Sequence, residues 1–265
     1  MKYLILLFVI LFSENVKSKS FPEISGCFCE GGIITGKVSM NDSLIIDGKK
    51  LKIFDGGRFI FAFGRKFKKS VNIVFNELSK DFTILDKKYK IERIKGLPRN
   101  KVEPSQKDLD KIFSDQKKIK DSKKVGSKRK LFSDIFILPA EGRLSGVYGS
   151  QRVLNSKPRK PHNGIDIAAK EGTKIIAPST GKVKLIAKNM FFTGNTIIID
   201  HGLGLISIFA HLKDIYVNEK DLVNQGDKIG SIGMTGRATG PHLHWGVYLE
   251  NTSVDPEVLL NFKLF

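Results

Sequence analysis

Residues 236–249 read Gly-Arg-Ala-Thr-Gly-Pro-His-Leu-His-Trp-Gly-Val-Tyr-Leu, and this stretch decides how the C-terminal half is interpreted. The glycines and the proline before residue 242 predict a loop, and the β-prone residues 242–249 predict a strand. Successive side chains of a strand face opposite sides, so His242 and His244 point the same way while Leu243 points the other way. Two histidines on one strand face are typical of a metal site or of a hydrogen-bonded groove.

A second pair of candidate ligands lies upstream, in His162-Asn-Gly-Ile-Asp166. Gly164 and the β-branched Ile165 favour a turn entering a strand over a helix, and either geometry puts His162 and Asp166 on one side. Catalytic zinc uses three protein ligands, usually histidines with one carboxylate, and keeps one position open. His162, Asp166 and one histidine of the 242/244 pair meet this requirement. The other histidine of the pair would then lie beside the metal, free to handle a proton.

All five histidines of the chain, at positions 162, 201, 211, 242 and 244, lie in its C-terminal part. Such clustering in a histidine-poor chain indicates one site. His211 ends the β-prone run Ile208–His211 and is expected to supply a second imidazole that does not bind metal. His201, in Asp200-His201-Gly202, is interpreted as part of a turn.

The residues around these motifs, 131–265, predict a large all-β unit. Short apolar runs alternate with glycines, and nothing in this range has the pattern of a long amphipathic helix. The runs are Ile175–Ala177, Val183–Ile186, Thr196–Ile199, Leu205–Phe209 and Leu243–Leu249.

Residues 21–95 predict a small β-sandwich-like module, because short β-prone runs alternate with Gly and Asp turn signals up to Tyr89–Ile94. Residues 96–130 predict a basic linker with a short helix around Leu109–Ile119, since the apolar stripe there is only partial. A solvated tether is the simpler interpretation of its lysines. Binding of a polyanion is the alternative.

Residues 1–20 predict a secretory signal: Met1-Lys2 is followed by the apolar run Tyr3–Phe12, which is too short to span a bilayer. We therefore expect export to the periplasm or cell envelope, with a retained N-terminal anchor as the alternative. Cys27 and Cys29 are the only cysteines. Because a disulfide between residues two apart would be strained, they are expected to be small side chains at the start of a strand or a surface thiol pair.

As a set, the motifs of the C-terminal half resemble the M23 peptidases, also called lysostaphin-like or LytM-domain endopeptidases. The resemblance covers roughly residues 138–256, and it rests on Gly146–Gly149, His162-x-x-x-Asp166, Ile199–Gly202, Phe209–Leu212 and Gly236–His244. It implies that His162, Asp166 and His244 bind zinc, one ion per chain, and that His211 and His242 are the catalytic histidines. It also implies an antiparallel β-sheet with the site in a groove. The upstream module looks like the β module that precedes this domain in some Gram-negative members.

The resemblance implies a zinc-dependent endopeptidase that hydrolyses peptide stems or cross-links of bacterial peptidoglycan. The alternative is a non-catalytic, wall-binding activator of another peptidoglycan hydrolase. The bond that is cut stays open between D-alanyl-diaminopimelate, a glycine bridge and a non-wall peptide. A formal net charge of +18 suits an anionic wall polymer as partner. Cell-division or wall-synthesis proteins are candidate partners. Nucleic acid is not expected, because the basic stretch Lys117–Lys130 lacks interleaved aromatics and a recognised fold.

Overall fold

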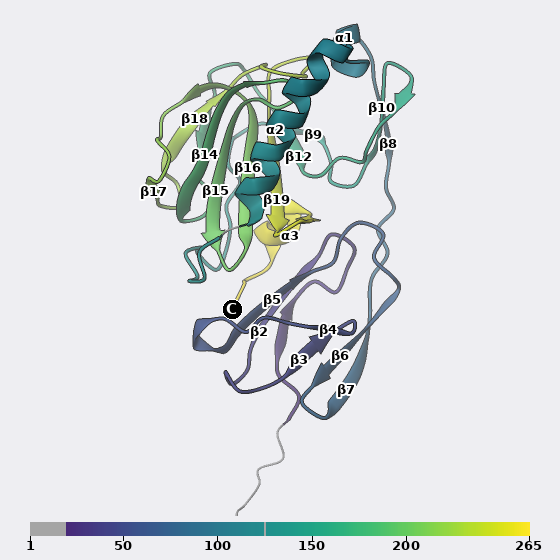
Figure 1. Cartoon of the computed structure of the whole chain (residues 1–265), viewed down its shortest axis with the longest axis vertical. Coiled ribbons are helices and arrows are strands. Elements are labelled where there is room, and N and C mark those ends of the chain that lie inside the picture. The colour runs from purple at the N-terminus through teal and green to yellow at the C-terminus, as the bar shows by residue number, and fades with distance from the viewer. Residues whose placement is uncertain (1–19, 125) are drawn as a thin grey trace, which may run out of the picture.

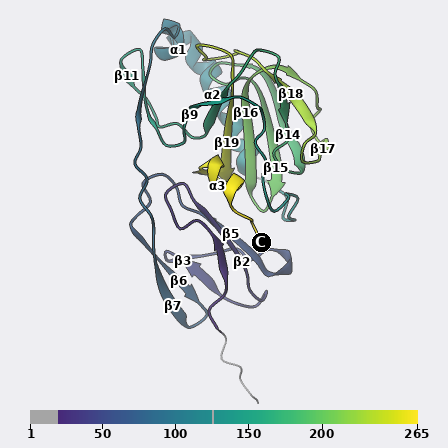
Figure 2. The same ribbon diagram turned by 180° about the vertical axis from the view of Figure 1, so that it is seen from behind.

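The computed structural model describes residues 20–124 and 126–265. The predicted signal segment therefore lies outside the described residues, except for Ser20. Within the described ranges, no helix is both long and apolar enough to cross a membrane. Figures 1 and 2 show two bodies joined by the chain around residues 84–95, an N-terminal β module and a larger C-terminal unit.

The N-terminal module consists of two antiparallel sheets, ordered β1-β2-β5 and β4-β3-β6-β7. Its strands are β1 (Ile24–Gly26), β2 (Ile33–Lys37), β3 (Leu44–Ile46), β4 (Lys49–Lys50), β5 (Arg58–Ala62), β6 (Ser70–Phe75) and β7 (Leu78–Thr83), with a 3₁₀ turn at Asp55–Gly57. Val71, Ile73 and Phe75 are buried while their neighbours in β6 are not, which is the alternation of a strand with one face in a core. They pack with Ile34 and Phe59 between the sheets, and the predicted sandwich is confirmed.

The C-terminal unit is built on one large antiparallel sheet with the main order β17-β14-β15-β16-β19-β12-β9. Strand β18 pairs with β13 and β16, and β20 pairs with β19. The strands are β9 (Arg143–Gly146), β12 (Ile165–Ala168), β13 (Lys174–Ile176), β14 (Gly181–Met190), β15 (Gly194–Gly202), β16 (Leu205–Ile215), β17 (Leu222–Val223), β18 (Lys228–Ile232), β19 (His242–Leu249) and β20 (Thr252–Val254). A short helix, α3 (Pro256–Asn261), follows β20. The predicted all-β, antiparallel class is confirmed.

The central strands β15 and β16 are buried on both faces, which explains their continuous apolar runs. On one face, Ile197 and Phe209 belong to the main core. On the other face, Ile198 and Ile208 pack against Ile119 of a helix that Figure 1 shows lying across the sheet.

That helix is α2 (Gln106–Lys124), which follows a single turn of helix, α1 (Arg99–Val102). It is 19 residues long, so the prediction of a short helix in the linker was wrong. Ile112 and Asp115 are buried on its inner side, and the Asp115 carboxylate accepts a hydrogen bond from the Phe191 amide at 2.7 Å. Much of the predicted linker is thereby a layer of the C-terminal unit. The few apolar residues of α2 predicted too short a helix, because polar contacts also hold it against the sheet.

The last strand assigned from sequence to the N-terminal module pairs elsewhere. Strand β8 (Ile91–Ile94) runs parallel to β10 (Gln151–Leu154), which pairs antiparallel with β11 (Lys157–Pro158). This three-stranded sheet lies beside the C-terminal unit (Figures 1 and 2). The segment between the two bodies therefore contributes a strand next to residues 146–166, where the first candidate ligands lie.

Cys27 and Cys29 form a disulfide, so the prediction of unpaired small side chains or a surface thiol pair was wrong. A tight turn explains the pairing, because the Cys27 amide bonds to Ile33 O at 2.9 Å and the Gly32 amide to Cys29 O at 2.8 Å. The turn holds the two Cα atoms 5.3 Å apart, within the usual range for a disulfide. The sequence argument assumed a more extended backbone.

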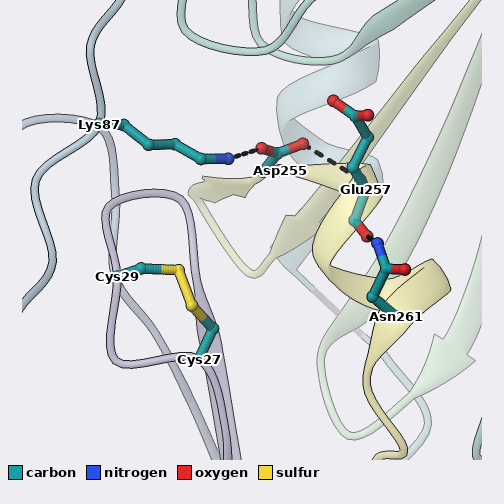
Figure 3. The surroundings of a disulfide bond; sticks show 6 residues. All are labelled: Cys27, Cys29, Lys87, Asp255, Glu257 and Asn261. Carbon is teal, nitrogen blue, oxygen red and sulfur yellow. Dashed lines mark hydrogen bonds and ion pairs between the residues drawn. A yellow bond between two sulfur atoms is a disulfide. The ribbon is translucent and has the colours of Figure 1, made fainter.

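The disulfide turn lies against the end of the C-terminal unit (Figure 3). Asp255 caps helix α3 by accepting from the Glu257 amide at 3.1 Å, and it also pairs with Lys87. The Asp255 amide donates to Gly31 O at 2.8 Å. Buried Cys29 belongs to the same core cluster as residues of the large sheet. The two bodies thus share apolar and polar contacts.

Candidate metal centre

The candidate ligands come from adjacent strands in matched register. Asp166 on β12 is directly paired with His244 on β19, and Ala168 with His242. Paired residues of neighbouring strands point to the same face, so Asp166, His242 and His244 project together. Leu243 is fully buried on the opposite face, as its alternation predicts. His162 lies just before β12 and completes the group.

The donor atoms of His162, Asp166 and His244 converge on one point. Asp166 Oδ1 lies 3.0 Å from His162 Nε2 and 2.9 Å from His244 Nδ1, and the two nitrogens are 2.9 Å apart. Zinc bonds of about 2.0–2.1 Å in a tetrahedron place the donors about 3.3 Å apart. Two neutral imidazoles and one carboxylate are also ligands that zinc prefers. The three residues therefore fit a zinc ion in both spacing and chemistry.

The Asp166 carboxylate is held in its charged form. Burial alone raises its pKa, but the adjacent rings of His162 and His244 outweigh that cost and hold the pKa well below its usual value. Its second oxygen, Oδ2, pairs with the guanidinium of Arg152. Arg152 is in turn paired with Glu92 at 3.4 Å, whose carboxylate also accepts from the Val147 amide at 3.2 Å. The carboxylate of this candidate ligand is thus oriented by a chain of charged groups that begins on β8.

The His162 ring is oriented by main-chain groups. Its Nδ1 lies 3.0 Å from Val147 O, and because a carbonyl oxygen only accepts, Nδ1 carries the proton. In the neutral ring Nε2 then has a free lone pair that points at the other two donors. The main chain at His162 is held by bonds to Gly149 and Ser150.

His211 is turned toward the same point by a β-bulge. On β16, residues 210 and 211 oppose the single residue 196 of β15, and His211 has a left-handed backbone with φ of 67°. The bulge brings its ring to 4.6 Å from that of His242, centroid to centroid. A non-glycine residue in this conformation costs of order 1 kcal/mol, so the surrounding structure compensates for it.

His211 and His242 share one tautomer. Nδ1 of His211 donates to Thr235 O at 2.7 Å, and Nδ1 of His242 donates to Gly240 O at 2.9 Å. Both Nε2 atoms are therefore lone-pair acceptors in the neutral rings. Burial, assisted by electrostatic repulsion from the neighbouring His242 and His244 rings, lowers the pKa of His211 to about 3. His211 is consequently neutral at neutral pH.

His201, expected to serve a turn, is fully buried within β15 and belongs to the support of the site. Its Nδ1 donates to Thr180 O at 2.9 Å, so its Nε2 accepts from the Ser207 hydroxyl at 2.8 Å. Ser207 accepts in turn from the Trp245 indole at 3.2 Å. Trp245 follows His244 directly, so this network holds β19 from the face opposite to His244. The turn itself is made by the next residues, 202–204, which have positive φ.

A cavity of about 450 Å³ opens beside the centre. Asp166, Ala168 and His242 line it from the sheet, Arg237–Pro241 line it from the loop before β19, and Glu92–Ile94 line it from β8. The candidate centre is therefore at the edge of a groove, as the resemblance implied. Space for a substrate exists on the side of His242.

Sequence reasoning missed Arg152 and Glu92, although both contact the site. Arg152 lies three residues after the Gly146–Gly149 motif, so proximity to a motif was the available signal. Glu92 offered none, because its contribution depends on the parallel pairing of β8 with β10. The structure brings all five predicted residues, His162, Asp166, His211, His242 and His244, into one cluster.

Comparison with known proteins agrees with this geometry. Residues 160–256 match the model of peptidase family M23. A metalloprotease of Buchnera aphidicola is 42% identical over 104 residues, which are 39% of this chain and 27% of that protein. The peptidoglycan DD-endopeptidase ShyB of Vibrio cholerae is 40% identical over 95 residues, 36% of this chain and 22% of the relative. The chain thus matches about a quarter of the length of these curated relatives.

A solved structure matches over more of the chain. A crystal structure from Pseudomonas aeruginosa assigned to peptidase M23 has a TM-score of 0.65 at 28% identity, covering 88% of this chain and 94% of that one. Residues 160–256 therefore form a peptidase family M23 domain, which confirms the resemblance drawn from the motifs. The structural match extends into the N-terminal module.

Proposed function

We propose that this chain is a zinc-dependent endopeptidase that hydrolyses peptide stems or cross-links of peptidoglycan. The observation that carries the proposal is the convergence of His162 Nε2, Asp166 Oδ1 and His244 Nδ1 within about 3 Å of one another, with a cavity beside them. The substrate class is supported by relatives named as peptidoglycan DD-endopeptidases, ShyB and ShyA of Vibrio cholerae.

In this proposal His162, Asp166 and His244 hold the metal. Bound zinc would supply a Lewis acid that polarises the scissile carbonyl and makes water more acidic. The lone pair on Nε2 of His242 accepts a proton from the attacking water and returns it to the leaving amine nitrogen. His211, which is kept neutral by burial, orients that water through its own Nε2. The carbonyls of Thr235 and Gly240 hold both rings in the required tautomer.

The same proposal implies the cellular compartment in which the protein acts. An enzyme that acts on the wall works in the periplasm or cell envelope, and the Cys27–Cys29 disulfide is consistent with the oxidising conditions found there. The positive net charge of the chain favours a wall polymer that carries carboxylates.

The test is digestion of purified sacculi, with the products identified by mass spectrometry. We expect the zinc-loaded wild type to release muropeptides, and we expect His162→Ala to lose both bound zinc and product release. His242→Ala should keep one zinc per chain and lower the rate by about 10²–10⁴-fold, the usual contribution of a general acid-base group. Matching product profiles for wild type and His162→Ala would overturn the proposal. Release that occurs only with a second hydrolase would identify an activator instead.

A further inference from the structure

The cavity beside the candidate metal centre carries more positive than negative charge. Its lining includes four arginines but only two acidic residues, Glu92 and Asp166. Arg152 pairs with both acids, so their charges are already engaged. The remaining lining arginines are Arg93, Arg143 and Arg237. A cavity with such an excess, in low-dielectric walls, favours an anionic occupant.

Arg143 is placed by the sheet on the substrate side of the centre. On β9 it pairs with Ala168 of β12, and Ala168 pairs with His242 of β19. All three side chains therefore lie on the face that presents Asp166 and His244. Two strand spacings separate Arg143 from His242, about 10 Å. The small Ala168 side chain between them leaves the space open.

The Arg143 guanidinium is exposed and has no hydrogen bond or ion pair to any described residue. Arg237 differs, because its guanidinium lies 4.4 Å from the centre of the Phe192 ring and its Nη1 is 3.5 Å from Lys101 O. Burial, with the nearby charges of Arg152 and Arg159, lowers the pKa of Arg237 to about 10, so it stays charged at neutral pH. Arg237 thus forms a fixed positive wall, whereas Arg143 is free to bind a ligand.

We propose that this cavity is a subsite for a carboxylate of the substrate peptide, and that Arg143 is the residue that binds it. The inference rests on the proposed peptidase function, since the hydrolysed peptide supplies the carboxylate. A guanidinium matches a carboxylate with two parallel hydrogen bonds. An extended peptide advances about 3.3–3.6 Å per residue, so the bound carboxylate lies within about three residues of the bond that is cut. Arg143 is a specificity-determining residue in this scheme.

The experiment compares two substrates that differ only in charge. One is a cross-linked muropeptide dimer with free stem carboxylates, and the other is the same dimer after those carboxylates are converted to carboxamides. The zinc-loaded full chain should have a kcat/KM about tenfold higher for the free acid, mainly through KM, because the amide lacks the charge that Arg143 pairs with. Arg143→Gln should lower kcat/KM for the acid about tenfold and change that for the amide less than twofold.

Arg129→Gln is the matched control. It removes the same charge from an exposed residue. The Arg129 carbonyl lies beside Gly202, at the end of the sheet far from His242. It should leave the ratio between the two substrates unchanged. Equal wild-type rates on acid and amide, or an equal loss on both in Arg143→Gln, would overturn the subsite.

Calorimetric binding of both dimers separates this proposal from the proposed function. Should the zinc-loaded wild type cut neither dimer but bind the acid several-fold more tightly than the amide, with the preference lost in Arg143→Gln, the subsite stands and the peptidase function fails. Equal binding of acid and amide by the wild type overturns the subsite whether or not either dimer is cut.

Discussion

At the scale of single residues, the candidate centre depends on hydrogen bonds that determine which ring nitrogen of each histidine carries the proton. Main-chain carbonyls accept hydrogen bonds from Nδ1 of His162, His211 and His242, so each neutral ring presents a lone pair on Nε2. Asp166 uses one oxygen toward the histidines and the other toward Arg152. Partners of this kind orient metal ligands and are often as sensitive to mutation as the ligands themselves.

We expect Arg152→Gln to weaken zinc binding about 10- to 100-fold, because Asp166 loses the charged donor that orients its Oδ2. The measurement is competition with a chelating dye for zinc, which does not depend on activity. Arg159→Gln is the control, since Arg159 donates to Val102 O at 2.7 Å and does not contact Asp166. Unchanged or tighter zinc binding in Arg152→Gln would contradict the orienting role.

His201 makes stability depend on pH. Burial lowers its pKa from 6.5 to about 4, so below pH 6.5 the unfolded chain takes up a proton that the folded chain does not. Its contribution to stability is complete above pH 6.5 and declines as the pH falls toward 4. Between pH 7 and pH 4.5 the free energy of unfolding should drop about 2 to 3 kcal/mol more in wild type than in His201→Gln.

Denaturant unfolding of both proteins over this pH range checks the prediction. The other four histidines are present in both proteins, so their effects cancel in the difference. Parallel pH profiles for the two proteins would show that His201 takes up its proton in the folded chain as readily as in the unfolded chain.

At the scale of elements, irregular strands aim the side chains of the site. The bulge at Ala210–His211 in β16 turns His211 toward His242. A second register shift, where β9 pairs with β12, makes Ser145 the extra residue. Gly146 then pairs with Asp166 and Arg143 with Ala168. Bulges commonly adjust side chains next to functional sites. Helix α2 covers the same face of the sheet as His244, near β14–β16, because Ile206 and Ile208 pack against it and pair with Tyr248 and Gly246 of β19.

We expect Asp115→Ala to lower the free energy of unfolding by about 1–3 kcal/mol, because the buried Phe191 amide loses its acceptor. Hydrogen exchange should also become faster along α2. Asp110→Ala, at an exposed position of the same helix, should change stability by less than about 0.5 kcal/mol. Equal effects of the two substitutions would mean that Asp115 does not anchor the helix.

At the scale of the whole molecule, the two bodies meet around the disulfide turn. Gly31 has φ of 76°, and a Cβ there would come within 2.6 Å of the Tyr148 ring and 3.1 Å of Asp255. Arg65 also donates to Gly149 O at 2.7 Å, and Lys87 pairs with Asp255. Tyr148 and Gly149 belong to the segment whose main chain orients His162, so contacts of the N-terminal module reach the residues that support the candidate metal centre.

Gly31→Ala should lower the free energy of unfolding by about 2–5 kcal/mol, the sum of left-handed strain and a clash at the interface. Gly48→Ala is a close match, because Gly48 has φ of 73° and a Cβ added there would have no atom within 4 Å, and it should cost about 1–2 kcal/mol. Denaturant unfolding measures both values, and limited proteolysis between residues 84 and 95 measures loosening of the interface. Equal costs would show that the interface accommodates the extra methyl group.

Local pattern was enough to predict much of this protein. Alternation placed His242 and His244 on one strand face, glycine and β-branched residues placed Asp166 at the start of a strand, and short punctuated runs predicted two β units. These features depend on neighbouring residues and on the two-residue period of a strand, which the sequence displays directly. The family resemblance then divided the five predicted site residues into three metal ligands and two catalytic histidines.

Only the tertiary structure decided the features that depend on residues distant in sequence. The pairing of β8 with β10 brings Glu92 to Arg152, the bulge in β16 depends on its register with β15, and α2 is held by the Phe191 amide. The Cys27–Cys29 disulfide needed a turn closed by a bond to Ile33. Each is set by long-range contacts that local propensity does not encode, because a register or a buried hydrogen bond exists only once both partners are in place.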